Sequence, residues 1–313
     1  MPSFPIPPTN EILSALQQTC LPAAGGAALV MAVFLACGRW AAGLGSAAAI
    51  VVGFAWSNYT FTALSWEGTG RLIPWKSDSI PPPAVVALPR AAIVLVVVGL
   101  ASRWLGIVVG RYQPPHRWWG ANLMTWAPRV AGVAVVSGWL VPAQLAESGW
   151  VWPVLAATML LNWIALDWPA RDGAGGQVAG YQAAGFLAAA VVLLYAHSGK
   201  YMEAAVTLGM AMAGVAVVAG PHRADTSGAV PAGAAFLPGL LLTGWASITS
   251  EVPVASYWLL GLSPLTLFVF CIPVVARQNR LVLAGGRAAL FLVPLIVAVT
   301  LAVANEQVVF DDF

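Results

Sequence analysis

The sequence contains very little charge. Only 8% of its 313 residues are Asp, Glu, Lys or Arg, whereas 60% are hydrophobic, and the mean hydropathy is +0.82. A water-soluble domain of this size needs more charge than this to cover its surface. The composition therefore predicts an integral membrane protein whose main partner is the lipid bilayer.

Motifs of metal-dependent and nucleotide-dependent chemistry are also missing. The sequence has no HExxH, GxSxG or P-loop motif. None of its three histidines lies in the middle of an apolar stretch, which excludes a bis-histidine haem inside the bilayer. Its three cysteines form no CxxC pair. We therefore expect no metal, no cofactor and no disulfide, and we lean against an enzyme.

The beginning of the chain lacks the basic segment of a signal peptide. The first eighteen residues carry one charge, that of Glu11. We expect the first apolar stretch to be retained as a helix.

Long apolar stretches dominate the rest of the sequence. A helix of roughly 20 apolar residues crosses the hydrocarbon core, and runs such as Ala91–Leu100 are continuously apolar, unlike the alternating strands of a membrane β-barrel. We predict an all-α, polytopic bundle of about ten spanning helices that forms a single transmembrane domain over 1–313. The predicted helices are 19–38, 41–63, 91–110, 130–148, 150–168, 180–197, 201–219, 232–251, 254–276 and 284–304.

The positive charges are distributed unevenly between the gaps. With the N-terminus outside, nine of the 14 Lys and Arg residues fall in cytoplasmic gaps and four fall in outer gaps. This bias follows the positive-inside rule and places both termini on the non-cytoplasmic side. The short loops favour a prokaryotic inner membrane.

Ten helices would divide into two inverted halves, 19–168 and 180–304. The fourth and ninth predicted helices, which occupy corresponding positions in the two halves, each contain a proline, Pro142 and Pro264. Interrupted helices at matching positions are typical of transporter sites.

Two further patterns predict packing and anchoring. Small residues recur at every fourth position of the second helix, at Ala41, Gly45, Ala49 and Gly53, which predicts a helix-packing seam. The gap Arg111–Arg129 contains three arginines and three tryptophans, which predicts a segment lying at anionic headgroups. Its apolar flanks argue against nucleic acid as a partner.

The longest gap, Ser65–Arg90, contains half of the candidate site residues. It reads either as an interfacial loop anchored by tryptophans or as a cap over an outer vestibule. Its charged candidates for substrate binding are Glu67, Arg71, Lys76 and Asp78.

The eighth predicted helix carries a polar stripe, since Thr243, Ser247 and Glu251 share one face. The stripe makes either interhelical hydrogen bonds or the wall of an outward-facing cavity. Arg103 is the one clear charge within a predicted span. It either snorkels to the inner interface or pairs internally at a functional site. Asn162, in the fifth predicted helix, is expected to bond to a neighbouring helix.

Three functions fit these patterns. The first is a small-solute carrier with an outward-facing polar vestibule. The second is a non-catalytic subunit of a larger membrane complex with other membrane subunits as partners, favoured by the lack of any recognisable buried charge pair. The third is a membrane-embedded enzyme that acts on a lipid-linked substrate at the outer face. The absence of an acid in the middle of any stretch argues against a proton-driven mechanism.

Overall fold

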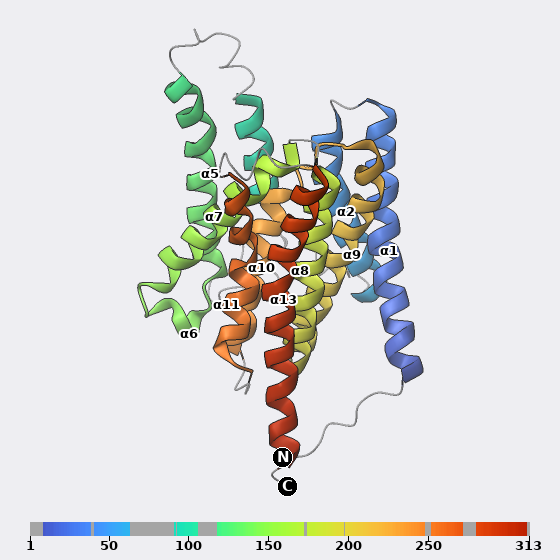
Figure 1. The fold of residues 1–313 in the computed structure, drawn as a ribbon, viewed down its shortest axis with the longest axis vertical. Helices are drawn as coiled ribbons and strands as arrows, with labels where there is room; N and C mark the ends of the chain where they lie inside the picture. The colour runs from blue at the N-terminus through green and yellow to red at the C-terminus, as the bar shows by residue number, and fades with distance from the viewer. Residues whose placement is uncertain are drawn as a thin grey trace.

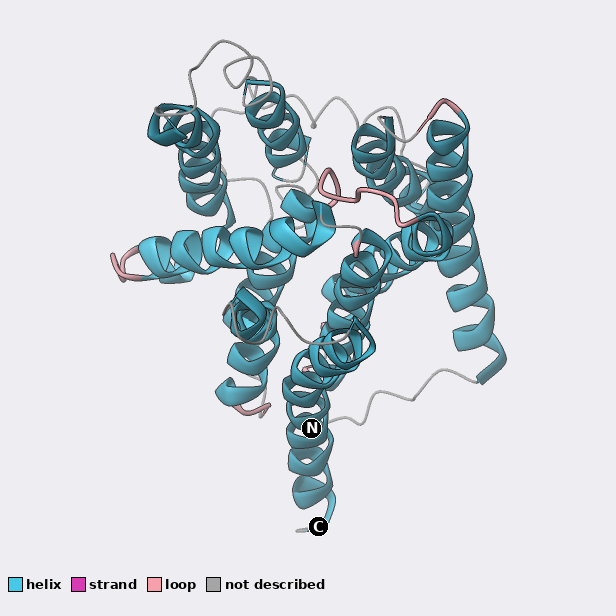
Figure 2. Ribbon diagram, turned by 45° about the horizontal axis from the view of Figure 1, so that its top comes forward, coloured by secondary structure: helices cyan, strands magenta, loops and turns pink. Residues whose placement is uncertain are grey.

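The structure is a computed structural model that describes residues 9–38, 41–62, 91, 93–105, 118–171, 174–196, 198–247, 252–271 and 280–311. Over these residues the chain is helical and contains no strand (Figure 2). The elements are α1 (Thr9–Ala36), α2 (Ala42–Thr62), the helix Ile93–Leu105, α5 (Trp118–Leu140), α6 (Ala143–Ala146), α7 (Val151–Arg171), α8 (Gly175–Tyr195), α9 (Gly199–His222), α10 (Val230–Ser247), α11 (Val254–Leu262), the 3-10 helix η3 (Ser263–Cys271) and α13 (Arg280–Asp311).

The all-helical class is confirmed for the described residues, and each of the ten predicted apolar ranges contains helix. Among the described residues, four helices are long and apolar enough to cross a bilayer, by length and composition. They are Val151–Ala170, Gly175–Tyr195, Tyr201–His222 and Val282–Asn305. Other helices contain shorter apolar stretches, such as Cys20–Ala36 in α1, so the count of ten spans remains a prediction. The start of α1 and the end of α13 lie toward the same end of the bundle (Figure 1).

The bundle is organised around α10. Every residue from Pro231 to Leu240 is buried, and α10 packs against α5, α7, α8, α9 and α11. A helix that is apolar on all sides belongs in a core. The outer helices instead expose large apolar side chains, such as Val217 on α9 and Ile296 on α13. An apolar exterior of this kind fits a hydrocarbon environment.

The predicted packing seam of α2 is confirmed. Gly45 lies against the side chain of Phe34, and Gly53 lies against the backbone carbonyl of Ala23. A methyl group at either position would collide with α1, so the small residues allow the two helices to approach closely.

The predicted boundaries are wrong around α5. Residues 118–129 were predicted to lie in an interfacial gap, but they form the first half of α5. The helix also ends at Leu140, short of the predicted 148, and Pro142 then precedes the short helix α6. The N-terminal extension places Arg129 inside the bundle, where it is buried.

Candidate functional site

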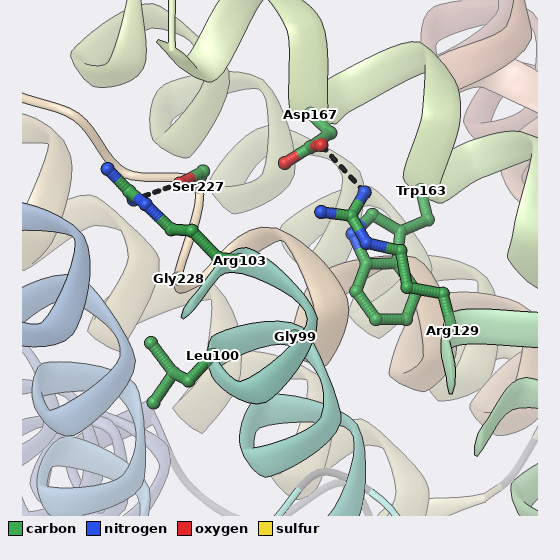
Figure 3. Close-up of a pocket in the computed structure, with 8 residues that line it drawn as sticks. All are labelled: Gly99, Leu100, Arg103, Arg129, Trp163, Asp167, Ser227 and Gly228. Atoms are coloured by element: carbon green, nitrogen blue, oxygen red, sulfur yellow. Dashed lines mark hydrogen bonds and ion pairs between the residues drawn. The ribbon is translucent and has the colours of Figure 1, made fainter. Parts of the chain in front are cut away.

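Two Arg–Asp ion pairs, Arg129–Asp167 and Arg103–Asp225, lie inside the bundle near the ends of α7 and α9. Figure 3 shows Arg129 with Asp167, and Arg103 with its hydrogen-bond partner Ser227. The first pair joins α5 to α7. Arg129 Nη1 donates to Asp167 Oδ2 at 2.8 Å, and the two side chains are 3% and 9% exposed. Ion pairs this deeply buried are rare, because the desolvation of two charges opposes their formation.

Other groups complete the surroundings of Arg129. Its Nε donates to the hydroxyl of Ser102 at 3.0 Å. Its guanidinium carbon lies 4.5 Å from the ring centre of Trp126 and 5.1 Å from that of Trp163. The cation is thus hydrogen-bonded at its edge and faced by aromatic rings, which is a favourable environment for a desolvated guanidinium.

The second pair joins the helix Ile93–Leu105 to the connection between α9 and α10. Arg103 Nη2 lies 2.5 Å from Asp225 Oδ2, and Arg103 Nη1 donates to Ser227 Oγ at 2.7 Å. Its side chains are more accessible, at 32% and 19% exposed. Asp225 also accepts the backbone N–H of Ser227 at 2.8 Å, so its carboxylate has a partner besides the arginine.

The α9–α10 connection is irregular backbone held within the protein. It leaves α9 through Arg223, whose φ of 47° turns the chain in the left-handed conformation. Residues 226–229 are then buried. Thr226 donates to the carbonyl of Gly175 at 2.9 Å, and Gly228 contacts the backbone of Gly43 so closely that no Cβ would fit. In a membrane protein, irregular backbone is stable only where protein or a cavity covers it.

A small cavity separates the two ion pairs. Its volume is about 10 Å³, enough for about one water molecule and too small for a solute. The cavity is lined by Gly99, Leu100, Arg103, Arg129, Trp163, Asp167, Ser227 and Gly228 (Figure 3). Trp163 is 1% exposed, and its indole Nε1 has no hydrogen-bond acceptor among the described residues.

Of the candidate residues predicted from sequence, Arg103 lies at this cavity. It forms the internal ion pair that one of the two interpretations predicted, whereas its functional role stays a prediction. Thr243 is buried and donates to the carbonyl of Gly239 in its own helix at 2.7 Å. The structure does not describe the side chain of Ser247. Glu67, Arg71, Lys76, Asp78 and Glu251 lie outside the described residues.

Asn162 behaves as expected, because its Nδ2 donates across to the carbonyl of Gly261 at 2.8 Å.

Sequence reasoning missed three of the four charged residues of this site, namely Arg129, Asp167 and Asp225. All three were predicted on the cytoplasmic side, Asp167 at the end of the predicted helix 150–168, and none was predicted to form an ion pair. The expectation that no charge pair is buried is wrong. The available signal was weak. Asp167 follows an apolar run in α7, and its partner precedes another in α5. Opposite charges at the ends of two consecutive predicted helices, 130–148 and 150–168, are compatible with an ion pair. The sequence alone does not show that the two side chains meet.

No known protein family, curated protein or solved structure matches this chain.

Proposed function

We propose that this chain is a small-solute carrier and that the two ion pairs close the cytoplasmic end of its pathway. The single observation that supports this proposal is the pair of Arg–Asp bridges around a polar cavity in an otherwise apolar bundle. Ionisable groups at membrane depth are costly and usually mark a pathway for solutes or ions.

The connectivity of the bridges fits a gate. Arg103 belongs to the first predicted half, 19–168, and Asp225 belongs to the α9–α10 connection of the second half, 180–304. The bridge between these two residues therefore joins the halves. Carriers move one half against the other around a central site. A bridge between the halves can therefore hold one arrangement, and its rupture can permit the other.

The cavity size fits a closed conformation. A space of about 10 Å³ admits no solute, so passage requires the Arg103–Asp225 bridge to separate. We place this end on the cytoplasmic side of a prokaryotic inner membrane, because the predicted gaps at this end contain most of the Lys and Arg residues.

Thiol labelling tests the gate. In a variant with Cys20, Cys37 and Cys271 replaced by serine, Leu100→Cys places a reporter at the cavity wall. We expect a membrane-impermeant maleimide to label it slowly, and faster from the cytoplasmic side after Arg103→Gln is added. Leu44→Cys, exposed on α2, is the control whose labelling should not respond to Arg103→Gln.

Flux measurements test the function itself. The purified chain in liposomes should take up at least one radiolabelled member of a panel of short carboxylates, neutral amino acids and pentoses faster than empty liposomes do. Failure to transport any of them, together with unchanged labelling of Leu100→Cys, would overturn the proposal. That outcome would favour the alternative function, a non-catalytic subunit of a larger membrane complex, for which a static bundle is expected.

A further inference from the structure

The cavity between the ion pairs is rich in hydrogen-bond donors. Each arginine has five N–H groups, and the indole of Trp163 adds one more. Trp163 Nε1 is buried and has no acceptor among the described residues. Because a buried donor without an acceptor is unfavourable, the lining is better suited to a ligand that brings acceptor atoms.

The two carboxylates that now neutralise the arginines are not equivalent. Asp167 and its arginine are almost fully buried. Asp225 is more exposed, and its Oδ1 accepts the N–H of Ser227. If Arg103 moved to another acceptor, Asp225 would keep this hydrogen bond and its contact with water. Asp225 is therefore the carboxylate that a ligand can replace.

We infer that the solute bound at this cavity is a small, water-soluble carboxylate, which takes the place of Asp225 on Arg103 while the Arg129–Asp167 pair stays intact. This inference rests on the proposed carrier function and specifies its substrate class. The planar fork of a guanidinium matches a carboxylate, and Arg103 already contacts one through Nη2, while its Nη1 donates to Ser227. The bound carboxylate would lie beside the indole N–H of Trp163.

The exchange also explains how a closed cavity can admit a ligand. Arg103 contacts Asp225 and Ser227 of the same connection, so one movement of its side chain releases both contacts. Gly43 lies directly against the guanidinium and leaves no space for a Cβ. Movement of the Arg103 side chain is thus limited on the α2 side.

The test compares acetate with acetamide, which has nearly the same shape and carries no charge. The full chain is solubilised in detergent, and its thermal unfolding is followed at matched ionic strength as each probe is added. A ligand that binds the native state raises the unfolding midpoint. We expect acetate to raise it in a saturable manner and acetamide to leave it unchanged.

Two variants locate the binding. Asp225→Asn removes the internal competitor and should lower the apparent Kd for acetate by about fivefold, since more of the protein then has an available Arg103. Arg103→Gln should abolish the acetate effect. Glu147→Gln is the control, because it removes an acid that does not line the cavity, and we expect it to leave the acetate affinity unchanged.

Several outcomes would overturn the inference. They are equal effects of acetate and acetamide on the wild-type chain, an acetate effect that survives Arg103→Gln, or a response to decanoate without one to acetate, which would indicate a fatty-acid chain rather than a small solute. The comparison on the wild-type chain stands even if a variant fails to fold. Uptake of a neutral solute without acetate binding would contradict the carboxylate inference and leave the carrier function intact. Acetate binding without flux of any solute would contradict the carrier function alone.

Discussion

The two ion pairs have the same chemistry and opposite environments. Arg129–Asp167 is sealed between α5 and α7, with side chains 3% and 9% exposed, whereas Arg103–Asp225 is 32% and 19% exposed at the edge of the cavity. A buried pair cannot lose one member without leaving a desolvated charge. A pair that water reaches can exchange partners at small cost. This difference is the basis of our proposal that the buried pair holds α5 and α7 together and that the more exposed pair is the one that opens.

The largest effect is expected when the two pairs are broken in the same way. Arg129→Gln leaves Asp167 buried without its cation and should lower the free energy of unfolding by about 3–5 kcal/mol. Arg103→Gln should lower it by only about 1 kcal/mol, because water can solvate Asp225. Unfolding in detergent, followed by circular dichroism, measures both.

A combined Arg129→Met and Asp167→Leu variant is the control, since replacing both charges with apolar groups should recover most of the loss. Equal losses for the two arginine variants would contradict the comparison.

The second prediction disturbs the more exposed pair, Arg103–Asp225, through the backbone. Gly228→Ala places a methyl group against the backbone of Gly43 and should displace the connection that contains Asp225. We expect a loss of about 2 kcal/mol. Gly220→Ala, where nothing lies within 4 Å of the new Cβ, is the matched control and should be neutral or slightly stabilising.

The same unfolding assay compares these two glycine variants. If Gly228→Ala were as stable as the control, close packing of the connection against α2 would not be important.

The third prediction removes one hydroxyl beside each arginine. Ser102→Ala leaves the Nε of buried Arg129 without its acceptor and should cost about 1.5 kcal/mol. Ser227→Ala removes a bond to the more exposed Arg103 and should cost about 0.5 kcal/mol. A double-mutant cycle with each arginine gives the coupling energies. A larger coupling for Ser227 with Arg103 than for Ser102 with Arg129 would contradict the prediction that the buried hydrogen bond contributes more to stability.

The smallest effect is expected from salt. Raising the ionic strength screens accessible charges and leaves buried ones almost unchanged. The destabilisation caused by Arg103→Gln should therefore shrink by a few tenths of a kcal/mol at high salt, whereas that caused by Arg129→Gln should not. Unfolding midpoints at low and high sodium chloride provide the measurement, and identical salt responses would argue against the difference in exposure.

Most of the helical elements could be predicted from sequence, because they depend on local composition. The apolar range 180–197 became α8, and the seam at Gly45 and Gly53 became the contact with α1. The start of α5 could not be predicted. Its sequence has the tryptophans and polar groups of an interface, and only the pairing with Asp167 on α7 makes Arg129 suitable for the interior.

Of the four charged residues of the candidate site, only Arg103 was predicted from sequence. Arg103 was noticed because it is a charge within an apolar run, and its pairing was one of two interpretations. Asp225 looked like an ordinary loop acid, since nothing local indicates that its connection is buried. The polar stripe at Thr243 gave a hydrogen bond within α10, and any role of Glu67, Arg71, Lys76, Asp78 and Glu251 stays a prediction.

The sequence by itself determined that this chain forms apolar helices suited to a bilayer, because the transfer of each segment out of water depends on its own side chains. Only the tertiary structure decided which charges meet. Arg129 and Asp167 are 38 positions apart, and Arg103 and Ser227 are 124 apart. The energy of an ion pair depends on distance and burial, and both are set when the helices pack.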